Sequence, residues 1–239
     1  MKIKIIVPVV SEYYNKIVLE DFGRVVRPDT SLSVVSLKRG PERIEDIYDE
    51  TFCVPFTLEE AKKAEEEGYN AVVFFCATDP GLSAAKELLN IPVVGMLESS
   101  MHLASQLGNK FSVVVPLKTS INAVIERARL YLLEDRLASV REVDTRVADL
   151  ETNIESMKKK LVKVGKECIR DGADVLIFGC GGFRRLSNWL QDQLGIPVIE
   201  PGLVAVRTAE MLVDLRLAQS KRTSMKPVPK KIYLYESCK

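Results

Sequence analysis

Two stretches of the chain decide its fold: Gly68-Tyr-Asn-Ala-Val-Val-Phe-Phe-Cys76 and, later, Gly172-Ala-Asp-Val-Leu-Ile-Phe-Gly-Cys180. Each is a short apolar run that begins after a glycine and ends at a cysteine, a pattern typical of a buried strand in a parallel sheet. The opening Lys2-Ile-Lys-Ile-Ile-Val-Pro8 is likewise repeated as Lys110-Phe-Ser-Val-Val-Val-Pro116. This internal repeat predicts two similar, pseudo-symmetric lobes.

Short β-branched runs alternate with longer amphipathic stretches, so the predicted fold class is α/β, with a four-stranded parallel sheet flanked by helices in each lobe. The expected strands are residues 3–9, 33–37, 71–75, 91–95, 111–115, 138–143, 175–178 and 196–199. The expected helices are residues 58–67, 81–89, 99–107, 121–133, 153–170, 184–194 and 203–218. Residues 232–235 are a candidate edge strand.

The last helix is expected to return to the first lobe. We therefore predict a first lobe of residues 1–98 plus 205–239 and a second lobe of residues 99–204. A ligand site is expected in the cleft between them.

The composition excludes several classes of protein. Among 239 residues, 34 Lys and Arg against 33 Asp and Glu leave a formal net charge of +1, without the basic footprint that nucleic-acid binding requires. No apolar run approaches the ~18 residues of a membrane helix. Five cysteines, an odd number without CxxC spacing, predict reduced thiols in a cytoplasmic protein. A single histidine provides too few ligands for a typical zinc site, so we expect no metal.

The two repeated cysteines are the candidate functional groups. Cys76 and Cys180 each follow a predicted buried strand and precede a helix, at the carboxyl end of a parallel sheet. If the lobes face each other about a pseudo-twofold axis, the two thiols meet across one cleft. A single buried cysteine is most often a small core residue, but two at equivalent positions favour a function. Cys53, Cys168 and Cys238 have no such placement.

The turns that carry these thiols offer hydrogen-bond donors. After Cys76, either Thr78 or Asp79 is placed to cap the next helix. Free amides at that helix start are expected to hold a carbonyl oxygen and to lower the pKa of the thiol towards neutrality. In the second turn, Gly181 and Gly182 lack side chains and let backbone amides approach a ligand.

Two opposed thiols suit the inversion of a stereogenic carbon. A thiolate removes a proton on one face while the opposed thiol returns one on the other. The turn amides stabilise the enolate-like intermediate, so no cofactor is required. A disulfide between the two cysteines is the alternative under oxidising conditions.

Six motifs together resemble the hydantoin racemase branch of the aspartate/glutamate/hydantoin racemase superfamily. They are Gly40-Pro-Glu-Arg-Ile-Glu-Asp-Ile-Tyr-Asp-Glu50, Cys76-Ala-Thr-Asp-Pro-Gly-Leu82, Ile91-Pro-Val-Val-Gly-Met-Leu-Glu98, His102-Leu-Ala104, Ala138-Ser-Val-Arg141 and Gly179-Cys-Gly-Gly182. The resemblance implies that Cys76 and Cys180 form a cofactor-independent acid/base pair. It also implies substrate contacts from Thr78, Asp79, Gly181 and Gly182, and assembly into homo-oligomers.

Departures from the family pattern bear on the substrate. The first strand ends in Val7-Pro8-Val9, followed by Ser11, where relatives commonly carry Asn-Pro-Asn, so Pro8 and Ser11 are the candidate contacts there. Amino-acid racemases of the superfamily tend to have Cys-Asn-Thr and Cys-Thr-Glu, whereas this chain has Cys-Ala-Thr and Cys-Gly-Gly. The missing glutamate favours a neutral or cyclic substrate, such as a 5-substituted hydantoin or allantoin.

Three alternatives stay open. One is an aspartate or glutamate racemase, and another is a decarboxylase or isomerase on the same architecture, although decarboxylases typically use one cysteine. The third is a two-lobed ligand-binding module that has lost catalysis. Glu98 is expected equally as a carboxylate at a helix start and as a residue that orients the cleft, whereas His102 is expected as a packed or partly exposed helix residue. Tyr48 and Phe52 are expected as core or pocket-lining aromatics.

Overall fold

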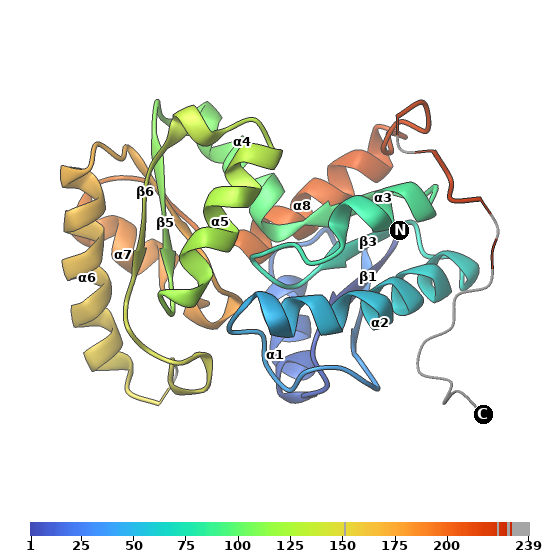
Figure 1. Cartoon of the computed structure of the whole chain (residues 1–239), viewed down its shortest axis with the longest axis horizontal. Coiled ribbons are helices and arrows are strands. Elements are labelled where there is room, and N and C mark those ends of the chain that lie inside the picture. Colours follow the sequence, from blue (N-terminus) through green and yellow to red (C-terminus); the bar gives the residue numbers. More distant parts are fainter. Residues whose placement is uncertain (151, 224, 229, 231–239) are drawn as a thin grey trace.

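The computed structural model describes residues 1–150, 152–223, 225–228 and 230, so the edge strand expected at residues 232–235 lies outside the described residues. The described strands form two four-stranded sheets in which all pairings are parallel (Figure 1). The first sheet has the order β2-β1-β3-β4, and the second has the order β6-β5-β7-β8. The repeated order confirms the α/β class and the two similar lobes.

All the expected strands are present. They are β1 (Lys2–Val7), β2 (Ser31–Ser36), β3 (Ala71–Phe74), β4 (Val93–Gly95), β5 (Phe111–Val115), β6 (Leu137–Glu142), β7 (Val175–Phe178) and β8 (Val198–Ile199). The helices are α1 (Tyr13–Gly23), α2 (Ile47–Glu66), α3 (Leu82–Leu88), α4 (Met96–Leu107), α5 (Thr119–Leu130), α6 (Ile154–Arg170), α7 (Ser187–Leu194) and α8 (Pro201–Asp214).

Two helices differ from the expectation. Helix α2 begins at Ile47 and not near residue 58, because the side chain of Asp46 caps it by accepting a hydrogen bond from the backbone N–H of Asp49 (3.0 Å). The helix also continues through Pro55, which usually ends a helix. Helix α1 was not expected, and it is anchored by Val18 and Phe22, which pack on the first sheet.

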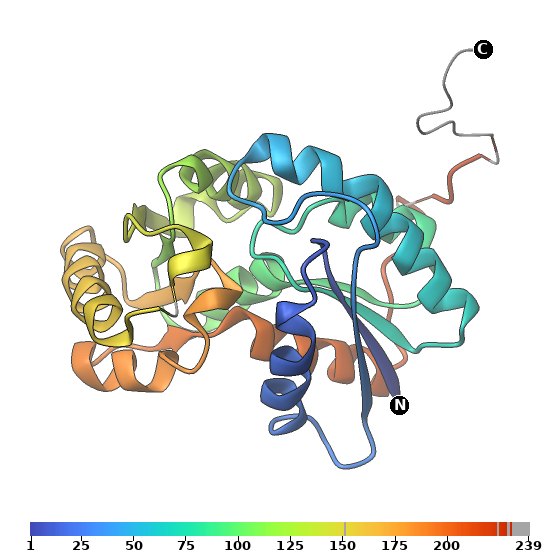
Figure 2. The same ribbon diagram turned by 90° about the horizontal axis from the view of Figure 1, so that it is seen from below.

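Helices cover both faces of each sheet. Helices α1 and α8 pack on one face of the first sheet, and α2 and α3 pack on the other. Helices α4 and α5 pack on one face of the second sheet, and α6 and α7 pack on the other. Helix α4 therefore leaves the first sheet to cover the second, and α8 leaves the second sheet to cover the first (Figure 2).

This exchange of helices joins the two halves. Leu97 and Met101 of α4 are fully buried against the second sheet, and Ala205 and Val206 of α8 are fully buried against the first. Helices α4 and α8 also contact each other. The expected return of the last helix to the first sheet is thus confirmed, while the residue boundaries of the two lobes stay a prediction.

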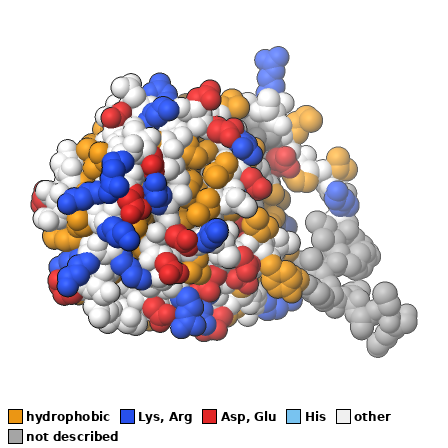
Figure 3. Space-filling view, turned by 60° about the vertical axis from the view of Figure 1, so that its left-hand side comes forward, with side chains coloured by type: hydrophobic (Ala, Val, Ile, Leu, Met, Phe, Trp, Pro, Cys, Tyr) orange, Lys and Arg blue, Asp and Glu red, His pale blue; other side chains and the backbone are white. Residues whose placement is uncertain are grey.

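The surface carries mixed charge. Basic and acidic side chains are interspersed over the face seen in Figure 3. Among the described helices, none is long and apolar enough to span a bilayer.

Candidate active site

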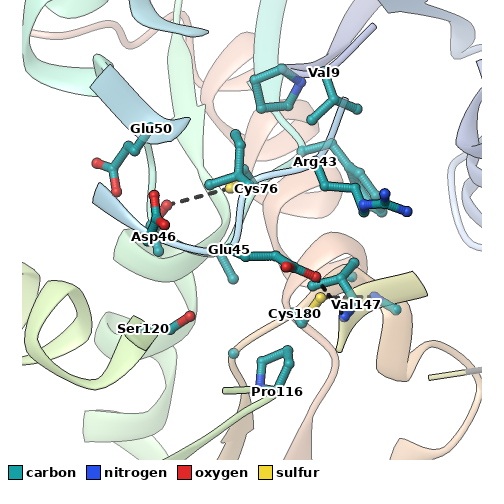
Figure 4. A pocket seen from close by; sticks show the side chains of 18 of the residues that line it. Val9, Arg43, Glu45, Asp46, Glu50, Cys76, Pro116, Ser120, Val147 and Cys180 are labelled. Carbon is teal, nitrogen blue, oxygen red and sulfur yellow. Dashed lines mark hydrogen bonds between the residues drawn. The ribbon is translucent and has the colours of Figure 1, made fainter. Parts of the chain in front are cut away.

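One cavity lies where strands of both sheets end. It contains about 800 Å³ of empty space, counted out to the solvent at its mouth. Its walls include Pro8, which follows β1, and Pro116, which occupies the repeated position after β5. Cys76 and Cys180 also line it, and their sulfur atoms face the same space in Figure 4. We call it the thiol cavity.

Cys76 begins the first thiol turn, residues 76–81, which connects β3 to α3. The hydroxyl oxygen of Thr78 lies 3.4 Å from the sulfur of Cys76, and both residues line the cavity. Helix α3 starts only at Leu82 and has no side-chain cap. The prediction that Thr78 or Asp79 caps this helix is therefore wrong.

Asp79 instead caps helix α4. Its carboxylate accepts hydrogen bonds from the backbone N–H groups of Leu97 (3.0 Å) and Glu98 (2.7 Å), and from the hydroxyl of Tyr131 (2.8 Å). Asp79 adopts a positive φ of 50°, which turns its side chain towards α4. It is 1% exposed, and burial raises its pKa to about 6. Asp79 is not among the residues that line the thiol cavity, so the structure gives it a structural position and not the expected substrate contact.

The thiol of Cys76 is less acidic than an ordinary thiol. Burial raises its pKa to about 12, against the effect of hydrogen bonds from Thr78, and the nearby Glu50 and Cys180 raise it further. The expectation that helix amides lower this pKa is therefore wrong, because α3 begins several residues after the sulfur and desolvation is the larger effect.

Glu50 is a cavity residue that the sequence did not reveal. It lies in the first turn of α2, is buried, and forms an ion pair with Arg127 of α5. Its carboxylate also takes a hydrogen bond from the side chain of Thr78, and burial raises its pKa. A buried carboxylate is thus connected through one hydroxyl to the sulfur of Cys76.

Cys180 begins the second thiol turn, residues 180–186, between β7 and α7. The backbone N–H of Gly182 donates to the sulfur of Cys180 (3.4 Å). Gly181 and Gly182 both line the cavity, but neighbouring side chains already fill the space that a Cβ would need. A Cβ at Gly181 would lie 2.6 Å from the ring of Phe75, and one at Gly182 would lie 2.6 Å from Leu150.

Pro8 and Ser11, predicted from the loop after the first strand, separate in the structure. Pro8 lines the thiol cavity, whereas Ser11 does not. Ser11 lies in an adjoining outer cavity with Tyr13, Tyr14 and Arg43. The chain turns away after Val9, where Val10 donates its N–H to the carbonyl of residue 41 (3.0 Å).

A loop over residues 41–46 crosses the cavity mouth and contacts the second lobe. The carbonyl of Glu45 accepts a hydrogen bond from Thr119, and its carboxylate accepts one from the N–H of Val147 (3.2 Å) (Figure 4). Arg43 and Asp46 of this loop also line the cavity. The sequence carried a signal here, since these charged residues follow a Gly-Pro turn, but it did not show which way they face.

The remaining candidates lie elsewhere. Glu98 is in the first turn of α4, as expected, and pairs with Lys86 (2.5 Å), while His102 is an exposed residue of the same helix. Tyr48 and Phe52 pack against each other on the outer face of α2, at 71% and 40% exposure. Neither lines the thiol cavity and neither is core, so both expectations for this pair are wrong.

Cys53 and Cys168 are buried core residues, and Cys238 lies outside the described residues. In the part of the chain that the structure describes, no group of three or more His, Cys, Asp or Glu side chains is arranged to hold a metal ion.

Comparisons with known proteins place this chain in a family. The family model for Asp/Glu/Hydantoin racemase matches residues 3–209. The hydantoin racemase of Pseudomonas sp. (strain NS671) is 38% identical, over 98% of this chain and 94% of its own length. That of Paenarthrobacter aurescens is 34% identical, over 98% of this chain and 100% of its own. The structure of allantoin racemase from Pseudomonas fluorescens has a TM-score of 0.92 at 29% identity, covering 98% of this chain and 100% of that one. The chain therefore belongs to the Asp/Glu/hydantoin racemase family of enzymes.

Proposed function

We propose that this racemase inverts carbon 5 of a hydantoin ring, in a 5-substituted hydantoin or in allantoin, with Cys76 and Cys180 as the acid/base pair and without a cofactor. The observation that carries the proposal is the single cavity lined by both cysteines, each at the same position of a repeated strand and turn. The named relatives, which are hydantoin and allantoin racemases, support this substrate class.

The reaction is a transfer of one proton in and one proton out. A thiolate takes the hydrogen from carbon 5, and the electron pair of the broken C–H bond delocalises onto the adjacent carbonyl oxygen as an enolate. The opposite thiol then gives its proton to the other face of carbon 5. The protons balance, because the sulfur that acts as base gains one proton and the sulfur that acts as acid loses one. The enzyme is then in the protonation state that accepts the opposite enantiomer.

The two sulfur atoms have different surroundings in this scheme. Because the pKa of Cys76 is raised to about 12, Cys76 carries its proton in the resting enzyme and serves as the acid. Cys180 is then the first base, and its sulfur accepts an N–H hydrogen bond from Gly182.

Cavity charge supports a neutral substrate over aspartate or glutamate. Glu42, Glu45, Asp46 and Glu50 all line the thiol cavity, together with the single cation Arg43. A dicarboxylic amino acid would bring further negative charge towards these carboxylates, whereas an uncharged ring would not.

The proposal is tested with single enantiomers in D₂O and no added cofactor. A 5-alkylhydantoin, allantoin, aspartate and glutamate are each incubated with enzyme, beside enzyme-free samples that correct for spontaneous racemisation. We expect the hydantoin or allantoin to racemise with deuterium at carbon 5, and the amino acids to stay unchanged. Racemisation of aspartate or glutamate alone would overturn the substrate class. Absence of both racemisation and deuterium uptake for every compound would favour a binding module.

A further inference from the structure

Each thiol turn is held by a charged side chain that comes from a helix of the opposite half. Helix α5, which follows the first strand of the second repeat, reaches the first thiol turn. Helix α1, which follows the first strand of the first repeat, reaches the second thiol turn. The two contacts therefore repeat the symmetry of the fold, although they use opposite charges.

The contact at the first turn is made by Arg127. Its Nε donates to the carbonyl oxygen of Thr78 (2.7 Å), two residues after Cys76 in the chain. Its guanidinium also pairs with the buried Glu50. One turn further along, Tyr131 donates its hydroxyl to Asp79 of the same thiol turn. Two residues with i, i+4 spacing thus join the end of β3 to the second half of the molecule.

The contact at the second turn is made by Asp21. This carboxylate of α1 is 7% exposed and accepts hydrogen bonds from Arg184 (2.8 Å) and Arg185, which follow Cys180 in the second thiol turn. Arg185 has a positive φ of 62°, and its backbone N–H donates to Glu200 (3.0 Å). The second thiol turn is therefore fixed at two points, of which Asp21 lies in the opposite half.

We propose that Arg127 and Asp21 are positioning residues that set the spacing of the two thiols. Neither side chain is among those that line the thiol cavity, so each acts through the turn that it holds. The expected effect on the reaction rate rests on the proposed two-thiol reaction. The expected effect on the distance between the two thiols does not depend on that proposal. Reacting atoms must approach within roughly 3 to 3.5 Å, and a misplacement of about 1 Å can cost about 100-fold in rate.

Two conservative substitutions test whether the hydrogen-bond geometry of Arg127 and Asp21 matters, apart from the charge or the size of the side chain. Arg127→Lys keeps the positive charge beside Glu50, but an ammonium does not reproduce the planar fork that serves Glu50 and Thr78 together. Asp21→Asn keeps the shape of the side chain and leaves one acceptor oxygen for two arginines. The matched controls are Arg129→Lys on α5, where Arg129 is exposed and pairs with Glu134, and Glu20→Gln on α1, next to Asp21 and exposed.

The experiment measures thiol spacing without relying on activity. The full-length protein is treated with dibromobimane, which cross-links neighbouring thiols, and the link between Cys76 and Cys180 is quantified by mass spectrometry. Parallel alkylation with monobromobimane corrects for altered thiol reactivity. Melting temperature, kcat and KM for racemisation are measured on the same samples.

We expect the wild-type protein and both controls to form the cross-link. In Arg127→Lys and Asp21→Asn, the corrected cross-linking rate falls, and kcat falls by about 10-fold or more with a smaller change in KM. Unchanged cross-linking in both variants, whatever happens to melting temperature or kcat, would overturn the proposal, as would a wild-type protein that forms no cross-link. Reduced cross-linking in an enzyme that racemises none of the compounds tested would leave the positioning role intact and remove the proposed function.

Discussion

The hydroxyl oxygen of Thr78 lies 3.4 Å from the sulfur of Cys76. A hydroxyl and a thiol can each donate, so either atom can supply the hydrogen of this contact, and the Thr78 side chain is also hydrogen-bonded to the carboxylate of Glu50. At the repeated position of the other turn stands Gly182, whose backbone N–H can only donate to Cys180. The repeat therefore places two thiols in one cavity but gives them different hydrogen-bond partners.

Thr78→Val tests this hydroxyl. Valine keeps the branched shape but cannot connect Glu50 with Cys76, so we expect kcat for racemisation to fall about 10-fold with little change in melting temperature. Thr78→Ser retains a hydroxyl and should restore most of the rate. Steady-state kinetics with each enantiomer check this, and a valine variant with wild-type kcat would show that the hydroxyl has no part in proton transfer.

Substitution of either cavity cysteine by serine should remove racemisation. A serine hydroxyl is a much weaker acid than a thiol, so we expect kcat to fall by at least about 100-fold in Cys76→Ser and in Cys180→Ser. Each variant keeps one thiol and can still exchange hydrogen with D₂O from one enantiomer.

Cys168→Ser is the matched control for the cysteine variants. Its thiol lies in the core of the second half beside Ser112 and Ser139, which can accommodate a hydroxyl, so racemisation should persist. Full racemisation by either cavity variant would refute the two-base mechanism.

The ionisation of Cys76 gives a pH prediction. Because its pKa is raised from 9.0 to about 12, the thiolate fraction should rise about tenfold per pH unit across the neutral and mildly alkaline range without reaching a plateau. The group also binds its proton more tightly when folded, so its contribution to stability is complete below pH 9 and is lost as the pH rises towards 12.

Alkylation of Cys76 by iodoacetamide, followed by peptide mapping in the Cys180→Ser variant, measures this ionisation directly. A rate that levels off near pH 7 would mean that the turn amides outweigh burial after all.

The sequence predicted the sheets and the thiol pair because both depend on local, repeated patterns. Short β-branched and apolar runs, most of them bounded by Gly or Pro, gave the strands, and equivalent positions after β3 and β7 placed Cys76 and Cys180 in one cavity. Glu50 and Arg127 escaped prediction because their role comes from an ion pair between distant helices, α2 and α5. Local spacing carries no information about such a contact.

For Asp79, the sequence correctly predicted a helix-capping residue but assigned it to the wrong helix. Its cap pattern is real, but a positive φ directs the carboxylate to α4, which is not the next helix in the chain. Gly181 and Gly182 do lie in the cavity, yet their lack of a side chain is also explained by the packing of Phe75 and Leu150.

Gly181→Ala tests that packing. A methyl group at this position would lie 2.6 Å from the Phe75 ring, which itself lines the thiol cavity, so the ring or the second thiol turn must move. We expect a destabilisation of about 1–3 kcal/mol, as for other overpacked sites, together with a clear loss of kcat. Gly23→Ala, at a site with open space around it and no positive φ, is the matched control for the loss of a glycine alone. Wild-type kcat in Gly181→Ala would show that the turn tolerates the displacement.

Asp79→Asn tests the cap that connects the first thiol turn to α4. Asparagine offers only one acceptor oxygen to the N–H groups of Leu97 and Glu98, and its amide N–H₂ group faces another donor. We therefore expect a loss of about 1–3 kcal/mol in the free energy of unfolding at pH 7. The wild-type carboxyl has a pKa raised from 3.8 to about 6. It binds its proton more tightly in the folded protein, and its contribution to stability is greatest below pH 3.8 and declines as the pH rises through 6. The stability advantage of wild type over Asp79→Asn should therefore grow by about 1 kcal/mol between pH 7 and pH 5.

Urea unfolding of both proteins at several pH values measures this difference. Asp192→Asn, which removes an exposed carboxylate from α7, controls for the loss of a negative charge and should show no comparable growth. An advantage that instead shrinks on acidification would mean that the two backbone N–H groups and Tyr131 stabilise the ionised carboxylate more than burial penalises it. In that case Asp79 acts as an ordinary charged cap at the start of α4.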